Sequence, residues 1–268
     1  MATDLPSTIA LPSGTLALVV EARSDVGLVR KVNEDSLLAA PPVFLVADGM
    51  GGHARGDAAS QVVTRVFTEH IVPGVLTTPE QVLDAIHSAN DAVRDLSEAG
   101  DSGTAVAGTT LTGVALVDGD IENEYGWMIF NVGDSRVYSW DGRVLEQQSV
   151  DHSAVQAMVD AGLISAEDAE QHPERNVITR ALGAEDTVDV DVWLSSPVEH
   201  STFLICSDGL TKELDRSEIT AIFARREARG DFGGIADELV EAAVEAGGRD
   251  NVSVVVVRTD AFTPSASL

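Results

Sequence analysis

Three aspartates in this chain stand beside short apolar runs of the kind that form buried strands. Two runs are followed by an Asp-Gly pair, and the third is preceded by Asp-Asn; the aspartates are Asp48, Asp208 and Asp250. Adjacent strands can bring such carboxylates to one rim of a sheet, where they would repel each other unless a cation lay among them. Because hard divalent cations prefer oxygen ligands, the pattern predicts a Mg²⁺ or Mn²⁺ site.

The competing interpretation is that each aspartate simply belongs to a turn. Asp-Gly is the commonest short hairpin signal, and we interpret Asp141-Gly142 in that way. The chain also holds 44 acidic residues, so one carboxylate beside a strand means little. Two features favour function: the glycine-rich stretch after Asp48, and an acidic motif upstream over residues 25–35.

Six motifs occur in an order expected of one known family. They are Asp25-x-Gly27-x-x-Arg30-x-x-Asn33-Glu34-Asp35, Asp48-Gly49-Met50-Gly51-Gly52-His53, Gly108-Thr109-Thr110, Gly133-Asp134-Ser135-Arg136, Ser207-Asp208-Gly209 and Asp250-Asn251. Together they resemble the metal-dependent serine/threonine phosphatases of the protein phosphatase 2C (PPM) family, in their bacterial form. The motifs extend from about residue 25 to residue 257, nearly the whole chain.

The order of expected elements indicates an α+β fold. Strands come in runs and helices in pairs, without strict alternation, which favours mostly antiparallel sheet. A capping box of Thr78 and Gln81 is expected to begin the second helix. The resemblance implies more: two packed antiparallel β-sheets flanked by helix pairs, an α-β-β-α sandwich, with the metal site at one edge. We expect a flexible tail over 1–14, one phosphatase domain over 15–260 and a second tail over 261–268.

The segment 151–183 is longer than the usual connection between elements, and long insertions often serve as lids or binding loops. The resemblance makes it the flap beside the active site, with backbone near Asn176 able to reach a third metal ion. We expect it to contact the protein part of the substrate and to move. The alternative is a helical hairpin packed rigidly on the sandwich.

The resemblance implies that two divalent ions activate a water for attack on the phosphate and screen its charge. Asp48 would bridge the two ions, and the carbonyl of Gly49 would add a ligand to one of them. Asp208 and Asp250 would hold the other ion. Asp134 would share a third, weaker ion with Asp208.

Arg30 is the candidate phosphate clamp, since a planar guanidinium can grip two phosphate oxygens at once. By resemblance, Glu34 and Asp35 would lie outside the ions and orient their coordinated waters. Eukaryotic relatives carry a histidine directly after the Asp-Gly pair, but this chain has Met50 there and its nearest histidine is His53. The general acid therefore stays unassigned.

Composition restricts the partners and the compartment. A net charge of −27 and a pI of about 4.3 would repel nucleic acid and anionic membrane surfaces. A phosphoprotein would be repelled too, unless bound metals and Arg30 supplied local positive charge. The single cysteine, Cys206, lies in an apolar run and argues against a cysteine-based phosphatase. With neither a signal peptide nor a membrane span in evidence, we expect a cytoplasmic protein.

The sequence predicts metal-dependent hydrolysis of phosphoserine and phosphothreonine in proteins, opposing bacterial serine/threonine kinases. The expected partners are phosphorylated proteins, namely such kinases or their substrates. One alternative is a metal phosphohydrolase that acts on small phosphoesters. Another is a catalytically weak relative that only binds phosphoproteins, against which the intact aspartates and Arg30 argue.

Overall fold

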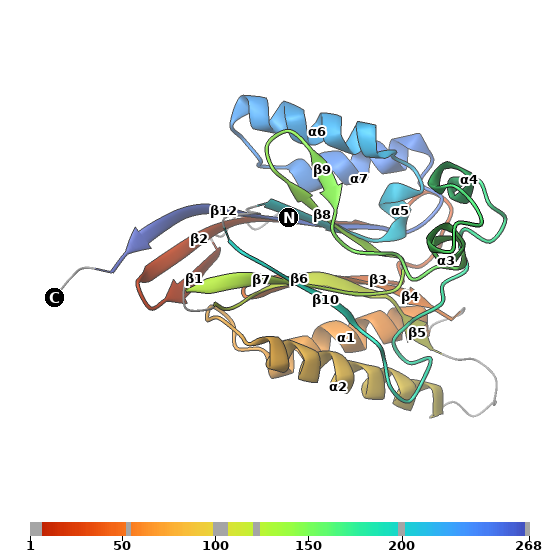
Figure 1. The fold of residues 1–268 in the computed structure, drawn as a ribbon, viewed down its shortest axis with the longest axis horizontal. Helices are drawn as coiled ribbons and strands as arrows, with labels where there is room; N and C mark the ends of the chain where they lie inside the picture. Colours follow the sequence, from red (N-terminus) through yellow and green to blue (C-terminus); the bar gives the residue numbers. More distant parts are fainter. Residues whose placement is uncertain (1–6, 52–54, 99–106, 120–123, 198–201, 266–268) are drawn as a thin grey trace.

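Two antiparallel β-sheets pack face to face in the computed structural model, and a pair of helices covers each outer face (Figure 1). The structure describes residues 7–51, 55–98, 107–119, 124–197 and 202–265. The layers are, in order, the helices α6 (Arg216–Arg229) and α7 (Ile235–Ala246), the first sheet, the second sheet, and the helices α1 (Gly56–His70) and α2 (Pro79–Glu98) (Figure 1). This is the α-β-β-α sandwich that the resemblance implies.

The elements have the following bounds. The first sheet contains, in order across it, β1 (Ser7–Leu11), β2 (Gly14–Asp25), β12 (Val252–Pro264), β11 (Thr202–Cys206), β8 (Arg136–Trp140) and β9 (Leu145–Gln147). The second contains β10 (Asp191–Ser195), β7 (Tyr125–Val132), β6 (Leu111–Asp118), β4 (Val43–Met50) and β3 (Asp35–Ala40), with β5 (Gly108–Thr109) paired to β4. The helices are α1 (Gly56–His70), α2 (Pro79–Glu98), α3 (Ala154–Asp160), α4 (Ala166–Glu170), α5 (Asp208–Thr211), α6 (Arg216–Arg229) and α7 (Ile235–Ala246).

The continuous apolar character of β4 follows from its place in the middle of the sandwich. Leu45 and Ala47 pack toward α1 and α2, whereas Phe44 and Val46 pack into the layer between the two sheets. Both faces of the strand are therefore dry, and each position needs an apolar side chain. The same alternation in β11 places Cys206 in the core under α6 and α7, where its thiol is buried. One of these strands, β4, carries Asp48, and the other, β11, leads into Asp208.

The sheets extend further toward the chain ends than expected, which corrects the expected tails. Residues 7–11 form β1, which pairs with β2 and buries Ile9 completely. At the other end β12 continues to Pro264, still paired with β2. The apolar positions of β1 are too few to stand out in a segment rich in Pro, Ser and Thr, so tertiary packing decides its structure.

No helix within the described residues combines the length and the apolar character needed to cross a bilayer.

Candidate active site

Asp48 lies near the end of β4, and two threonines fix its backbone. The amide of Asp48 donates to the Thr110 hydroxyl oxygen at 3.0 Å. The Thr109 hydroxyl and the Thr110 amide both donate to the carbonyl of Asp48, each at 2.9 Å. The two threonines of the Gly108-Thr109-Thr110 motif therefore hold in place the backbone that carries the Asp48 carboxylate.

Gly49 is required because three stretches of backbone meet there. A Cβ on this residue would lie 2.1 Å from the carbonyl oxygen of Gly56 and 2.6 Å from that of Glu34. The Gly49 amide donates to the same Glu34 carbonyl at 3.1 Å. Any side chain would force the Asp48 strand away from α1 and from the acidic motif.

Asn251 connects the acidic motif to the last strand. Its side-chain amide donates to the carbonyls of Val26 and Val32, both at 3.0 Å. Its side-chain oxygen accepts from the Glu34 amide at 2.9 Å. The loop 26–32 is thus closed by one side chain and presents Arg30 at the rim of the site.

Asp208 and Asp250 are brought together by a residue that sequence reasoning missed. Asp208 begins α5, and Asp250 lies two residues before β12. The Lys212 ammonium forms ion pairs with Asp208 and, at 3.0 Å, with Asp250 Oδ2. A lysine four residues after an aspartate is an ordinary helix-surface spacing, so no local pattern marks Lys212 as part of the site.

Arg30 also contacts Asp250. One guanidinium nitrogen lies 2.9 Å from Asp250 Oδ1, and another lies 3.9 Å from a carboxylate oxygen of Glu34. The expected phosphate clamp therefore stands directly beside an expected metal ligand. Its side chain is about half exposed, which leaves it accessible from solvent.

Asp134 occupies the turn between β7 and β8 and is buried. His152 braces the turn, because its Nδ1 accepts from the Gly133 amide at 3.0 Å while its own amide donates to the Gly133 carbonyl at 2.9 Å. The other ring nitrogen, Nε2, lies 3.3 Å from Asp191 and 3.1 Å from Arg180. The turn that carries Asp134 is thus linked to the end of the segment 151–183.

Burial and mutual repulsion raise the pKa of most of these carboxyls. Burial, followed by the nearby aspartates, raises the pKa of Asp48 well above its ordinary value. Burial likewise raises the pKa of Asp35 and of Asp134 to about 7. Burial also opposes ionisation of Asp250, but Lys212, Arg30 and the Asn251 amide together outweigh burial and lower the pKa of that group. The cluster accumulates more negative charge than its cations neutralise.

The donor set fits a divalent cation in its chemistry. Three buried carboxylate oxygens have no hydrogen-bond partner: Oδ1 of Asp35, of Asp134 and of Asp208. Unpartnered buried oxygens are costly in the absence of a ligand. Among the described residues, however, no three carboxylate, imidazole or thiol side chains stand around one point as a finished metal cage. Lys212 and Arg30 lie where such a cage would need to close on Asp250.

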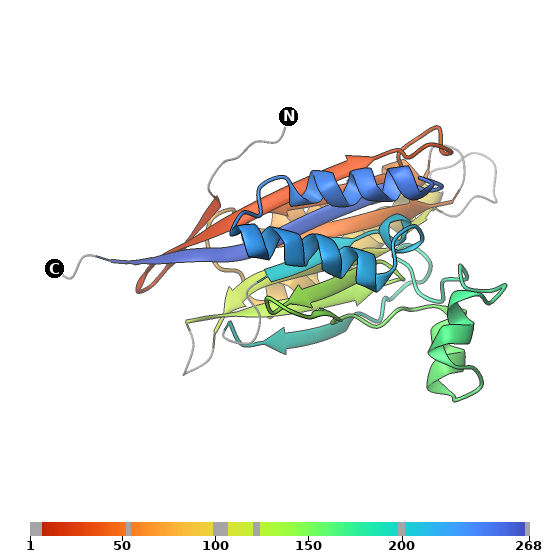
Figure 2. The same ribbon diagram turned by 90° about the horizontal axis from the view of Figure 1, so that it is seen from above.

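The segment 151–183 contains two short helices, α3 and α4, at the same end of the sandwich as α5 and β5 (Figure 1). Figure 2 shows α3 and α4 standing away from the two sheets. The segment is anchored at its base, where Ala154 N donates to the carbonyl of Val177 and Leu182 N donates to that of Thr109. His53, the nearest histidine to the Asp-Gly pair, lies outside the described residues.

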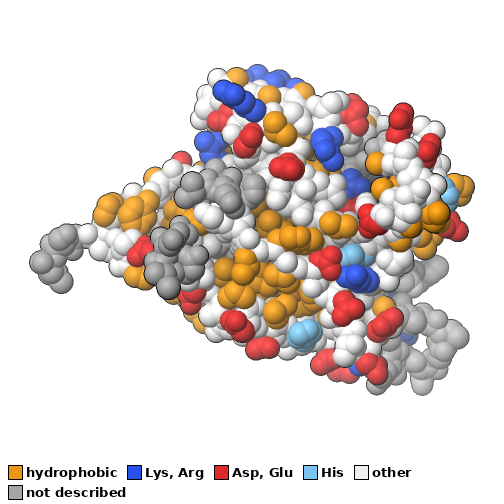
Figure 3. Space-filling model, viewed as in Figure 1, with side chains coloured by type: hydrophobic (Ala, Val, Ile, Leu, Met, Phe, Trp, Pro, Cys, Tyr) orange, Lys and Arg blue, Asp and Glu red, His pale blue; other side chains and the backbone are white. Residues whose placement is uncertain are grey.

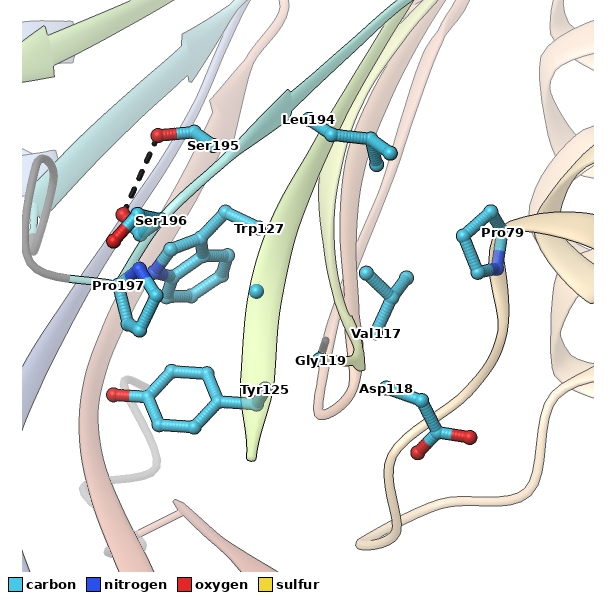
Figure 4. A pocket seen from close by; sticks show the side chains of 11 residues that line it. Pro79, Val117, Asp118, Gly119, Tyr125, Trp127, Leu194, Ser195, Ser196 and Pro197 are labelled. Atoms are coloured by element: carbon cyan, nitrogen blue, oxygen red, sulfur yellow. Dashed lines mark hydrogen bonds between the residues drawn. The ribbon is translucent and has the colours of Figure 1, made fainter. Parts of the chain in front are cut away.

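A pocket of about 370 Å³ lies at the start of β7, the end of that strand away from the Asp134 turn, and it is mostly apolar (Figure 4). Trp127, Tyr125 and Leu194 contribute to its lining, and Asp118 is the one acidic side chain among the described residues that line it. It opens beside β10, the edge strand of the second sheet, over which apolar side chains gather on this face (Figure 3). The pocket is remote from the carboxylates, and its lining within the described part of the chain carries no cationic side chain for a phosphate.

Stacked antiparallel sheets between helix pairs, with a carboxylate cluster and an arginine at one end, define the class of metal-dependent protein phosphatases. The chain belongs to the protein phosphatase 2C family, whose model matches residues 30–242.

Individual relatives agree with this assignment. The serine/threonine phosphatase stp of Listeria monocytogenes serotype 4b is 34% identical over 257 residues, covering 90% of this chain and 95% of the relative. The PPM Ser-Thr phosphatase MsPP of Mycobacterium smegmatis, solved with cacodylate, is 34% identical with a TM-score of 0.75, covering 90% of this chain and 98% of that one. The catalytic domain of the phosphatase PstP, solved with two manganese ions, is 33% identical with a TM-score of 0.71, covering 91% and 100%.

Proposed function

We propose that this protein removes phosphate from phosphoserine and phosphothreonine side chains of other proteins, using two Mn²⁺ or Mg²⁺ ions. The observation that carries the proposal is the set of buried carboxylates around Asp48 with Arg30 at their rim. That set lies at one end of a protein phosphatase 2C fold.

The ligand assignment follows the places of the residues. Asp48 is the most central carboxyl, because its pKa responds to the four other aspartates of the cluster. It is the group suited to bind both ions, and the Gly49 carbonyl would add a ligand to one of them. Asp208 and Asp250 would hold the second ion, and Asp134, whose pKa Asp208 raises, is the candidate for a third, weaker one.

When bound, the ions supply an activated water and screen the charge of the phosphate. The chain itself supplies the grip on the substrate. Arg30 is half exposed at the rim and can turn its guanidinium toward two phosphate oxygens. Glu34 lies beside Arg30 and Asp35 pairs with Asp48 across the sheet, which supports a role for both in orienting water around the ions. A general acid stays unassigned, since His53 lies outside the described residues.

A protein substrate is favoured over a small phosphoester by the names of the relatives, which are protein phosphatases. A purely binding role is disfavoured, because every carboxylate expected to ligate a metal is present in the cluster. We propose that the physiological partners are bacterial serine/threonine kinases or their substrates. A cytoplasmic location stays a prediction from the sequence.

The test is hydrolysis of a phosphothreonine peptide by the full chain. We expect turnover with added Mn²⁺ or Mg²⁺, loss of turnover with EDTA, and recovery when the metal is restored. A nucleoside monophosphate, at matched concentration, is the control substrate and should be hydrolysed far more slowly. Full turnover in metal-free buffer would contradict the metal-dependent mechanism, and faster hydrolysis of the nucleotide would favour the small-phosphoester alternative.

A further inference from the structure

Lys212 is an unusual occupant of an acidic site. The chain contains only two lysines, Lys31 and Lys212, against 15 arginines and 44 acidic residues. One of these two lysines has its ammonium between the two aspartates that the proposed function assigns to one metal ion. Its side chain is about one third exposed, and the aspartates are more deeply buried.

The charges around Asp250 are shared between two cations. Lys212 Nζ contacts Oδ2 at 3.0 Å, and Arg30 contacts Oδ1 at 2.9 Å. Lys212 is also paired with Asp208, whose Oδ1 is buried without a partner. The ammonium therefore occupies the side of this carboxylate pair that a divalent ion would need.

The backbone of Lys212 is held firmly in this place. Its amide donates to the Asp208 carbonyl at 2.8 Å, and its carbonyl accepts from the Arg249 guanidinium at 3.0 Å. Arg249 is itself clamped by the carboxylate of Glu213, through two nitrogen–oxygen contacts of 2.9 and 3.0 Å. The four-carbon stem of Lys212 is therefore the part that can move.

We propose that Lys212 is a resident counter-cation of the Asp208–Asp250 pair, and that a divalent ion enters this pair only by displacing its ammonium. The inference rests on the proposed function, since it takes these aspartates as metal ligands. Lys212 and the ion compete for the same carboxylate oxygens, so the two occupancies exclude each other.

This competition has two consequences of opposite sign. Without metal, the ammonium neutralises carboxylates that would otherwise be buried and unpaired, so it stabilises the metal-free fold. With metal, the ion must first break those ion pairs, so its affinity is lower than the carboxylates alone would give. The protein is thus able to stay folded when the metal is scarce and to release the ion readily.

The direct test uses the wild-type protein and an amine-acetylating reagent. Acetylation of Lys212 and of Lys31 is followed by mass spectrometry, with EDTA or with saturating Mn²⁺. Only the neutral amine is acetylated, and the ion pairs with Asp208 and Asp250 keep Lys212 protonated. We expect Mn²⁺ to raise the acetylation rate of Lys212 at least several-fold, because the displaced amine has left these ion pairs and the nearby positive ion favours its neutral form. Lys31, which is exposed, is the control in the same sample and should not change. An unchanged or slower rate at Lys212 while Mn²⁺ binds would overturn the proposal.

A second test compares Lys212→Met with Lys31→Met by titration of the metal-free proteins with Mn²⁺. Methionine keeps most of the length of the stem without the charge. We expect Lys212→Met to bind Mn²⁺ at least tenfold more tightly than wild type and to unfold at a lower temperature in EDTA. Lys31→Met should match wild type in both measurements.

Equal Mn²⁺ affinity in wild type and Lys212→Met would overturn the competition while leaving the metal site intact. Absence of Mn²⁺ binding in every variant would instead remove the metal site, and with it both proposals. If Lys212→Met does not fold, the acetylation rates of the wild-type protein still decide the question.

Discussion

Asp35 and Asp48 stand directly opposite each other in the antiparallel pairing of β3 and β4. Like charges in such a position destabilise a sheet; Asp35 is buried and Asp48 is only partly exposed. One oxygen of Asp35 accepts from the Ser207 hydroxyl at 2.8 Å, and the other has no partner. This pair therefore stores unfavourable electrostatic energy that a cation between the two sheets would relieve.

The stability of the metal-free protein should depend on the ionisation of Asp35. Its folded-state pKa of about 7 lies above the unfolded value of 3.8, so the folded state holds the proton more tightly. Stability supplied by this group is full at low pH and is lost as the pH rises through about 7. The variant Asp35→Asn lacks this carboxyl. Its free energy of unfolding relative to that of wild type should therefore increase by roughly a few kcal/mol as the pH rises across this range.

The measurement is the free energy of unfolding by urea, in EDTA, at several pH values from 4.5 to about 8. The quantity of interest is the difference between Asp35→Asn and wild type, because the other carboxyls then largely cancel. A difference that stays constant with pH would contradict a raised pKa of Asp35. Asp141→Asn, at an exposed turn, is the matched control. Backbone amides lower the pKa of Asp141, so this group stays ionised over the whole range and the difference from wild type should not change with pH.

Two substitutions in the cluster should have opposite effects on the metal-free fold. Asp48→Asn removes a buried charge that faces other carboxylates, so the melting temperature in EDTA should rise. Asp250→Asn removes a carboxylate that Lys212 and Arg30 share as an ion-pair partner, so the melting temperature should fall. Both should lower turnover by several orders of magnitude.

Calorimetry in EDTA and phosphopeptide hydrolysis with Mn²⁺ measure the two effects separately. Near wild-type turnover in either variant would show that its role in the metal site is assigned wrongly. If both variants instead melt at a lower temperature than wild type, the contacts of Asp48 contribute more to stability than its repulsion of the other carboxylates costs.

Arg30→Ala should mainly weaken phosphate binding. A clamp that grips substrate and transition state equally raises the affinity for both, so its loss should raise KM with kcat little changed. Arg30→Lys should restore only part of the loss, since lysine lacks the two-pronged geometry. Steady-state kinetics on one phosphopeptide decides the matter, and a fall in kcat at unchanged KM would contradict a ground-state role.

The segment 151–183 should influence the choice of substrate more than the chemistry. Replacing residues 157–171, which include most of α3 and α4, by a short glycine-serine linker leaves the base contacts of Ala154 and Leu182 in place. We expect discrimination among phosphopeptides to fall while hydrolysis of a small aryl phosphate is largely kept. Equal losses on both substrates would favour the rigid-hairpin interpretation.

Much of the site could be predicted from the sequence, because each of the three aspartates Asp48, Asp208 and Asp250 lies next to an apolar run that forms a strand. The runs before Asp48 and Asp208 are buried strands, and the run after Asp250 is the start of β12. The capping box was also predictable, and Gln81 N donates to the Thr78 hydroxyl oxygen at 3.2 Å. Such features depend on neighbours in the chain, so local patterns reveal them.

What the sequence did not reveal depends on contacts between distant segments. Asn251 closes a loop more than 200 residues away, at the carbonyls of Val26 and Val32. Lys212 looks like any helix-end lysine until Asp250 is placed beside it. Residues 7–11 become a strand only because β2 lies alongside and Ile9 fills a gap between the sheets. No local pattern encodes these partners.

The course of β12 determines where the protein can be attached to a surface or a partner without obstructing access to the carboxylate cluster. From Val252, two residues after Asp250, β12 runs 13 residues to Pro264 and ends at the tip away from α3 and α5 (Figure 1). At about 3.3 Å per residue, that distance is roughly 40 Å. A surface, a label or a fused module attached beyond Pro264 would therefore leave the catalytic end open to large substrates. Anything tethered there could reach the carboxylates of its own chain only through a long linker.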